Sequence, residues 1–324
     1  REMCRRRYAR NRAGILIGHP IEMATKLRGP VRVGYTVFEL DKIPEDDIPR
    51  YKSLTEVWTT SKWGQGVLKE HGIDSKIVPE GVNLTLFYPK EEERLDQRFC
   101  FLSAARLYER KNLSCLIEAF CEEFSPKEEV VIIGLWFDFE SGSGNALRLA
   151  LRHVKNGHKV KVWPEGGRGG STIIIYPVLP TKRELVKLYR SVDCGVFPYR
   201  AEGWCLPLIE MMACGKPCIA TNYSGPTEFI NERNCYLLSP GRLIHAVDPE
   251  FSLDGNQGRW ADPPKEELKV LMRKVLEHRE EAHRLGQEAA RQMKNWTWDN
   301  AAQIASTYIE ELEERYGLKG EATE

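Results

Sequence analysis

The sequence predicts an α/β fold that is built on parallel sheets. Short apolar runs of strand length alternate with amphipathic stretches of helix length through most of the 324 residues. Runs such as VVIIG at 130–134 are apolar throughout, which is typical of strands that helices cover on both faces. Repeated units of this kind form a doubly wound sheet, and such sheets bind ligands at the carboxyl ends of their strands.

The composition narrows the class of protein. Hydrophobic residues make up 42% and charged residues 29% of the chain, which suits about two globular domains. The formal net charge is zero, so no strong field favours nucleic acid as a partner. No apolar run approaches the ~18 residues that cross a membrane, and the basic N-terminus lacks the apolar segment of a secretory signal. Nine scattered cysteines without a pairing framework indicate reduced thiols and a cytoplasmic protein.

Residues 1–92 are expected to form a first, thin domain. Strands are expected at 13–20, 31–39 and 56–63, and a helix at 62–72. A full parallel-sheet domain needs more strands, so we expect this one to be incomplete. Truncation of the chain, residues left out of the sequence and a naturally reduced domain are all consistent with that. The charged stretch PKEEERLDQR at 89–98 follows a proline and is typical of a linker.

The elements of the second domain begin after this linker. A strand at 100–105 leads into a helix at 112–124, with Asn112 placed to cap it. Thr181 and Glu184 form a capping box at the start of a helix with one apolar face. Further strands are expected at 129–134, 158–163, 171–178, 194–199 and 217–221, and further helices at 144–157, 264–283 and 297–317. Thr297 or Asp299 caps the last helix.

The stretch EGWCLPLIEMMACG, which begins at Glu202, predicts a loop that runs into a helix. Pro207 fits the first turn of this helix, and Gly215 fits its end. A helix that starts after a strand offers free N–H groups and a positive dipole end, which favour a phosphate. Gly203 lets the backbone approach a ligand closely.

Two glutamates bracket the predicted phosphate position. Glu202 lies before the helix and Glu210 about one turn after its start. Carboxylates suit hydroxyl groups, so the layout suggests a ligand with a charged middle and hydroxylated ends, as in a nucleotide sugar. Two glutamates at this spacing are, on their own, more often solvated. The apolar neighbours of Glu210 argue for burial, and a buried charge needs a partner.

The stretch EGWCLPLIEMMACGKPCIATNYSGPTEFI resembles the signature of glycosyltransferase family 4, in which seven residues separate two glutamates. The match includes the glycine after the first glutamate, the Leu-Pro pair, the Ala-Cys-Gly-Lys-Pro turn and the later Ser-Gly-Pro-x-Glu. SAARLYERKNLSCLIEAF at 103–120 and KIVPEGVNLTLFYP at 76–89 agree with the family too. The resemblance is good over roughly 55–240 and looser elsewhere.

The resemblance implies a GT-B fold, in which two Rossmann-like parallel-sheet domains face each other across a cleft. The domain at 93–290 would hold the nucleotide-sugar donor. The incomplete domain at 1–92 would supply most of the acceptor site. The helix within 291–324 would cross back to the first domain.

The resemblance also implies roles for individual residues. Glu202 would contact hydroxyls of the donor sugar and Glu210 the ribose. Arg106 and Lys111 would bind the diphosphate, Arg106 through two N–H groups and Lys111 as a point charge. Backbone groups of the loop and helix start would lie near the sugar and the phosphate; these residues are Gly203, Trp204, Cys205 and Leu206. Base recognition is expected near 177–180, at Val178.

The family transfers sugars with retention of configuration and without a bound metal ion. The sequence has no Asp-x-Asp triplet, which agrees with metal independence. Fixed cations and N–H donors would then stabilise the charge that develops on the leaving diphosphate. No cofactor is expected beyond the UDP- or GDP-sugar, which is a co-substrate.

The chain departs from the family pattern in its first domain. Many members place a histidine after a strand near the reacting sugar, but the comparable stretch VRVGYTVFELDKIP has none. Tyr35, Thr36 and Glu39 are the candidates to face the cleft instead. Glu39 would stabilise positive charge on the sugar or position the acceptor, and its alternative is a solvated loop carboxylate. His19, which also follows a strand, is a second catalytic candidate, although a lone histidine is more often structural.

The function that these observations favour is a glycosyltransferase that moves a sugar to a hydroxyl of a glycan or lipid-linked saccharide. Two alternatives remain open. One is a nucleotide-sugar-binding protein without transferase activity, and the other is a different GT-B enzyme, such as a nucleotide-sugar epimerase. The basic run RRRYARNR at 5–12 fits a solvated helix face or a peripheral contact with a membrane surface.

Overall fold

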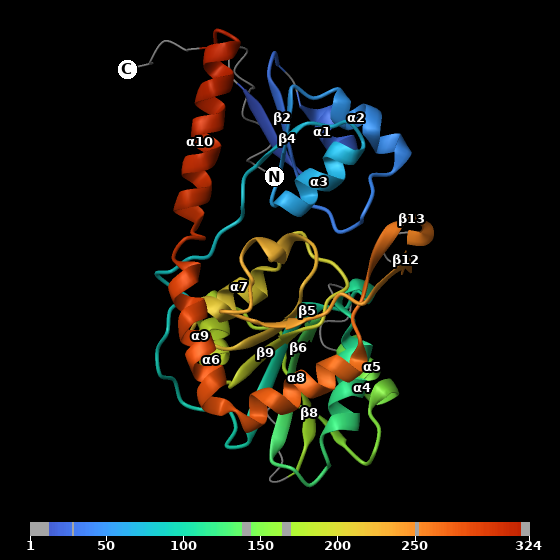
Figure 1. Ribbon diagram of the computed structural model, residues 1–324, viewed down its shortest axis with the longest axis vertical. Helices are drawn as coiled ribbons and strands as arrows, with labels where there is room; N and C mark the ends of the chain where they lie inside the picture. The colour runs from blue at the N-terminus through green and yellow to red at the C-terminus, as the bar shows by residue number, and fades with distance from the viewer. Residues whose placement is uncertain (1–12, 28, 138–143, 164–169, 250–252, 319–324) are drawn as a thin grey trace.

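The computed structural model describes residues 13–27, 29–137, 144–163, 170–249 and 253–318. The basic run at 5–12 lies outside the described residues. The chain forms two lobes, each built on a parallel sheet (Figure 1). The predicted α/β class with parallel sheets is therefore confirmed. No helix in the described ranges is long and apolar enough to cross a membrane.

The N-terminal lobe contains a four-stranded parallel sheet in the order β1-β2-β3-β4. Its strands are β1 Gly14–Ile17, β2 Arg32–Thr36, β3 Glu56–Thr59 and β4 Ser75–Ile77. Its helices are α1 Pro20–Lys26, α2 Ile48–Lys52 and α3 Lys62–Glu70. The prediction of three strands was wrong, because β4 was missed. This strand has only three residues, and such a short segment shows no periodicity.

The last helix, α10 Trp298–Arg315, covers one face of the N-terminal sheet (Figure 1). Leu312 of α10 is fully buried in a cluster with Val33 and Trp58, and Tyr308 packs edge-on against the Trp58 ring. The hydroxyl of Thr297 accepts a hydrogen bond from Asn300 N, so of the two expected caps it is Thr297 that acts.

The C-terminal lobe contains a seven-stranded parallel sheet in the order β11-β10-β9-β5-β6-β8-β7. Its strands are β5 Phe99–Arg106, β6 Val130–Phe137, β7 Lys159–Val162, β8 Thr172–Ile175, β9 Cys194–Phe197, β10 Cys218–Thr221 and β11 Tyr236–Leu238. Its helices are α4 Leu113–Glu123, α5 Gly144–His153, α6 Lys182–Arg190, α7 Leu206–Ala213, α8 Lys265–Glu277 and α9 Arg279–Met293. One apolar cluster contains side chains of α6, α7 and α9, and the other contains those of α4, α5 and α8. The two clusters lie on opposite faces, as a doubly wound sheet requires.

Local predictions in this lobe had mixed outcomes. The capping box of Thr181 and Glu184 is confirmed, because both reciprocal hydrogen bonds are present. The side-chain cap by Asn112 was wrong. Asn112 lies at the start of α4 in a left-handed conformation, with φ at 57°, and its amide donates to Pro198 O across 3.2 Å. The single helix expected at 264–283 was wrong too, since α8 ends before His278 and α9 begins after it.

An antiparallel hairpin, β12 Arg242–Asp248 and β13 Leu253–Asp262, was not predicted. It rises from the C-terminal lobe toward the N-terminal lobe (Figure 1). The Arg259 guanidinium binds the Asp41 carboxylate at 2.8 Å, and Arg259 N donates to the same carboxylate at 2.6 Å. The hairpin therefore connects the two lobes on one side of the space between them.

Candidate active site

A cavity of about 470 Å³ lies between the lobes, at the carboxyl ends of the C-terminal strands. Arg106 ends β5, and the loop that follows β9 contributes Glu202. The charged residues that line the cavity are Glu39, Glu80, Arg106, Arg110, Lys111, Lys182, Glu202 and Glu210. The cavity thus occupies the position at which doubly wound sheets bind ligands.

Glu202 forms the charged centre of this cavity. Its carboxylate is buried and pairs with the Lys111 ammonium through one oxygen and with Arg110 Nη1, at 2.9 Å, through the other. Burial alone would raise the pKa of Glu202, but the two cations outweigh it and hold the pKa below its ordinary value. Glu202 is therefore an anion at neutral pH, fixed in orientation by two donors.

Arg110 connects the lobes across the cavity. Its Nη2 lies 3.0 Å from Glu39 Oε1, while its Nη1 binds Glu202. Burial raises the pKa of Glu39, and Arg110 opposes that shift. The charged side chains thus form an alternating chain of Glu39, Arg110, Glu202 and Lys111 that spans both walls of the cavity.

Glu210 lies in the middle of α7 and faces the same cavity. Lys182 Nζ contacts its Oε1 at 2.7 Å, and the Tyr189 hydroxyl lies 3.4 Å from its Oε2. Burial raises the pKa of Glu210, although the Lys182 pair lowers it. Both partners come from α6, so the packing of α6 against α7 holds the carboxylate in place.

The start of α7 faces the cavity between the two glutamates. Cys205, just before the helix, has φ at 71°, a left-handed conformation that is uncommon for a residue with a side chain. Pro207 lies in the first turn and Gly215 follows the last, with φ at 79°, as predicted. A Cβ on Gly203 would overlap Val37 of the other lobe. The glycine is therefore required by the contact between the lobes, besides any approach to a ligand.

Arg106 differs from the other cations of the site. It is exposed, and its Nη1 lies 3.1 Å from the Tyr108 hydroxyl. It lines the cavity at the end of β5, opposite the start of α7. Arg106 and Lys111 thus reach the same cavity, but Lys111 is held by Glu202 whereas Arg106 has solvent beside it.

The chain is similar in sequence to a known protein family. Residues 86–292 match the family model described as glycosyl transferases group 1, which covers more than half of the chain. The chain belongs to this family.

Two curated proteins are similar to the chain over most of its length. A probable sucrose-phosphate synthase of Thermosipho melanesiensis is 27% identical over 72% of the chain, and a D-inositol 3-phosphate glycosyltransferase of Acidothermus cellulolyticus is 24% identical over 95% of it. The chain spans 47% of the length of the first relative and 65% of the second.

Solved structures share the fold. Sucrose-phosphate synthase from Thermosynechococcus elongatus aligns with a TM-score of 0.64 at 18% identity, over 89% of this chain and 69% of that one. HepE from Anabaena, in complex with UDP-glucose, aligns with a TM-score of 0.61 at 15% identity, over 85% and 71%. These alignments span both lobes and confirm the expected arrangement of two parallel-sheet domains.

Two candidates lie outside the cavity of this glycosyl transferase chain. Val178 is half exposed and is not among the described residues that line it. His19 caps α1 by accepting from Ile21 N, and its Nε2 lies 3.7 Å from Asp47. It lines an adjoining cavity of about 450 Å³, which also contacts Glu39 and Arg110. The other candidates, Glu39, Arg106, Lys111, Gly203, Trp204, Cys205, Leu206, Glu202 and Glu210, all line the first cavity.

Sequence reasoning missed Arg110, Glu80, Lys182 and Tyr189, all of which line the cavity. Arg110 stands beside Lys111, and two adjacent cations after a strand were a usable signal. The partners of Arg110 and Lys182 are distant in the chain, and no local pattern indicates them.

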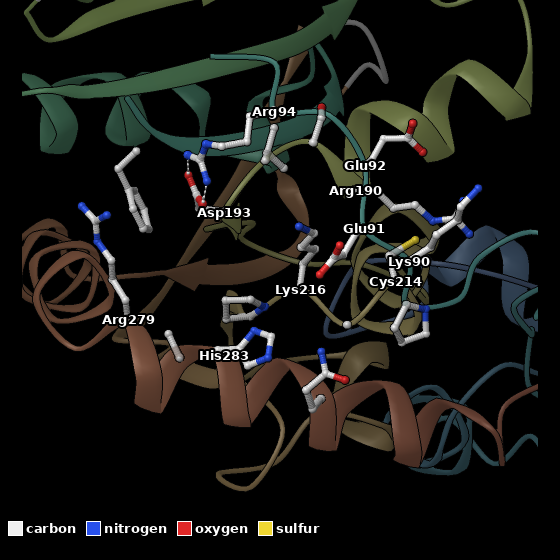
Figure 2. A pocket seen from close by; sticks show the side chains of 18 of the residues that line it. Lys90, Glu91, Glu92, Arg94, Arg190, Asp193, Cys214, Lys216, Arg279 and His283 are labelled. Carbon is white, nitrogen blue, oxygen red and sulfur yellow. Dashed lines mark hydrogen bonds and ion pairs between the residues drawn. The ribbon is translucent and has the colours of Figure 1, made fainter. Parts of the chain in front are cut away.

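A larger hollow of about 740 Å³ lies at the opposite side of the C-terminal sheet, where the strands begin (Figure 2). It is lined by the linker, by α9 and by residues that precede β5, β9 and β10. In it the Arg94 guanidinium binds the Asp193 carboxylate through two contacts of 2.7 and 2.8 Å, as Figure 2 shows. Doubly wound sheets rarely bind ligands at the amino ends of their strands. The smaller cavity, at the carboxyl ends, is therefore the better candidate for the active site.

Proposed function

We propose that this chain is a retaining glycosyltransferase that moves a sugar from a UDP- or GDP-sugar to a hydroxyl of a saccharide acceptor. One observation carries the proposal: Glu202 and Glu210 line a single cavity on either side of the start of α7. A diphosphate fits between them, at the positive dipole end of α7. The sugar then lies beside Glu202 and the ribose beside Glu210.

The cations of the cavity suit the chemistry of the proposed reaction. The bond between the anomeric carbon and the diphosphate oxygen breaks, and the acceptor oxygen bonds to that carbon on the same face. The hydroxyl proton leaves on the diphosphate. Arg106, Arg110 and Lys111 lie where they can neutralise the negative charge that grows on the leaving group. We assign that role to these side chains and propose that the reaction proceeds without a metal ion.

The adjoining cavity is the proposed acceptor site. It shares Val37, Glu39 and Arg110 with the donor cavity, so a molecule bound there reaches the donor sugar. Trp260 of the hairpin and Tyr51 of the N-terminal lobe also line it, and flat apolar side chains of this kind suit a sugar ring. Glu39 lies at the boundary, where its carboxylate can position the attacking hydroxyl.

Calorimetry and donor hydrolysis test the proposed function. We expect UDP-glucose or GDP-mannose to bind with 1:1 stoichiometry, and slow release of free hexose from the bound donor. UDP-glucose belongs in the test because HepE, which shares the fold, was solved with it. Glu210→Ala should weaken binding of the free nucleotide, whereas Arg183→Ala on the exposed side of α6 should not. Binding without any hydrolysis or transfer would favour the non-catalytic alternative, and no binding of either donor would refute the proposal.

A further inference from the structure

Glu80 lines the donor cavity on a segment whose backbone is fixed by the start of α10. Val82 N donates to Trp296 O across 2.8 Å, and a Cβ on Gly81 would overlap the backbone of Thr297. The segment therefore packs directly against the start of α10. Glu80, one residue earlier, is held at the wall of the cavity where the two lobes meet.

The charges of this region leave Glu80 without a counter-ion. Four carboxyl groups line the cavity, and two of them, Glu39 and Glu202, are charged neighbours of Glu80. The cations of Arg110 and Lys111 contact Glu202 and Glu39. Within the part of the chain that the structure describes, the side chain of Glu80 makes no hydrogen bond or ion pair. A third carboxylate among these groups is unfavourable, because like charges at short range disfavour the ionised form.

The side chains that face Glu80 include two other carboxyl groups. Tyr35 and Glu39 face it from β2 and the loop after β2, and Glu202 faces it from the loop before α7. Thr297 and Trp298 at the start of α10 are uncharged, and Asp299 in its first turn is acidic. Burial raises the pKa of Glu80 to about 7, with smaller contributions from Glu202 and Glu39. Glu80 is thus an O–H donor below that pH and a carboxylate above it.

We propose that Glu80 binds the donor as a neutral carboxylic acid and donates a hydrogen bond to a hydroxyl of the donor sugar. This role rests on the proposed function, since it needs a nucleotide sugar in the cavity. The sugar is the favoured partner because Glu80 has Glu202 and Glu39 as its charged neighbours, and Glu202 is the residue assigned to the donor sugar. A protonated carboxyl has a donor that a carboxylate lacks, and sugar hydroxyls accept as well as donate.

The test measures the affinity for UDP-glucose, and for GDP-mannose, by calorimetry between pH 6 and pH 8.5. The phosphates of both donors are diesters and do not titrate in this range. In the parent protein we expect affinity to fall roughly tenfold as pH rises through 7, because the hydrogen bond is lost and a negative charge appears. Glu80→Gln keeps a neutral donor, so its affinity should stay within about twofold over the same range. Glu80→Leu should bind weakly at every pH.

Three controls make the outcome specific to Glu80. Glu70→Gln, an exposed substitution on α3, should behave as the parent. Glu39→Gln should keep the pH-dependent fall, moved to lower pH, because it removes a negative neighbour of Glu80. Melting temperatures near that of the parent would show that the Glu80 variants are folded.

Two results would overturn only the role of Glu80. One is a fall in donor affinity with pH that persists unchanged in Glu80→Gln, and the other is a Glu80→Leu variant that binds the donor like the parent. Failure of the parent to bind either donor would refute the proposed function and this role together.

Discussion

Glu202 shows how one buried carboxylate is kept charged by its neighbours. Its pKa lies below the ordinary 4.5, because Lys111 and Arg110 outweigh the effect of burial. The stability that these pairs contribute is therefore present above pH 4.5 and is lost as pH falls through the lowered pKa. Above that range, Glu202→Gln leaves two cations facing a neutral group.

The lowered pKa of Glu202 predicts how the stability of the Glu202→Gln variant depends on pH. We expect the variant to melt below the parent at pH 7, since removing one partner of a buried pair costs roughly 3 kcal/mol. The difference in melting temperature should shrink as pH falls below 4.5, because the parent then becomes protonated too. Melting curves from pH 7 to pH 3 measure it. A difference that stays constant down to pH 3 would contradict the pairing.

Arg106 and Lys111 are predicted to act in the transition state, but their effects on folding should differ. Arg106→Ala should lower the transfer or donor-hydrolysis rate at least tenfold, about 1.4 kcal/mol, with little change in melting temperature, because Arg106 is exposed. Lys111→Ala should lower the rate by a similar factor and also destabilise, because it removes a partner of buried Glu202. Rates within twofold of the parent would refute the catalytic role. Arg183→Ala, an exposed arginine on α6, is the control.

The residues of the site could be predicted only in part. Glu202 and Glu210 are visible in the sequence because they flank a helix start with a proline and a glycine. The pairing of Arg110 with Glu39 joins residues on different lobes, and no spacing in the sequence indicates it. For the same reason, the contact of Lys111 with Glu202 could not be predicted.

At the scale of elements, the hairpin β12–β13 is the feature with the clearest separate role. It closes one side of the proposed acceptor cavity through Trp260, and Arg259 holds it on Asp41 of the other lobe. The Arg259 side chain is half exposed, so we expect this pair to contribute only about 0.2–1 kcal/mol. A free-energy change of this size alters the fraction of molecules in which the hairpin is detached from the N-terminal lobe.

Arg259→Gln should therefore raise the amide hydrogen exchange rate of residues 259–261 by roughly two- to fivefold. Mass spectrometry of short peptides measures this rate. Arg242→Gln, a highly exposed arginine on the same hairpin, should leave it unchanged. The exchange of Asp41→Arg together with Arg259→Asp should restore part of the protection. Equal exchange in the parent and in Arg259→Gln would show that the pair does not hold the hairpin.

Elements with strong periodicity or apolar runs could be predicted, and short or polar ones could not. The capping box fixed the start of α6, and the apolar runs located the buried strands of the large sheet. Strand β4 is three residues long, and the hairpin strands contain many polar residues, so neither has a pattern that separates it from a loop. These elements depend on contacts with distant parts of the chain.

At the scale of the whole molecule, α10 joins the two lobes by covering the N-terminal sheet. Leu312→Ala should cost about 2–4 kcal/mol, because the side chain is fully buried against that sheet. Urea unfolding followed by tryptophan fluorescence measures the loss. Val270→Ala on α8, where the side chain is 64% exposed, should change stability by less than about 0.5 kcal/mol. Equal losses for the two variants would contradict the docking of α10.

The arrangement of the lobes follows from the resemblance to known proteins rather than from periodicity. Alternating strands and helices predict two parallel sheets but not that their carboxyl ends face each other. In the structure they do, and this brings Glu39, Glu80 and Glu202 to one cavity. The central claim is that a nucleotide sugar fills that cavity.

The most direct test is a crystal structure of the protein with UDP-glucose or GDP-mannose. We expect electron density for the diphosphate at the first turn of α7, with the hexose beside Glu202 and the ribose within hydrogen-bonding distance of Glu210. Density for the donor in the hollow lined by Arg94 and Lys216, or against any surface outside the cleft between the lobes, would contradict the claim.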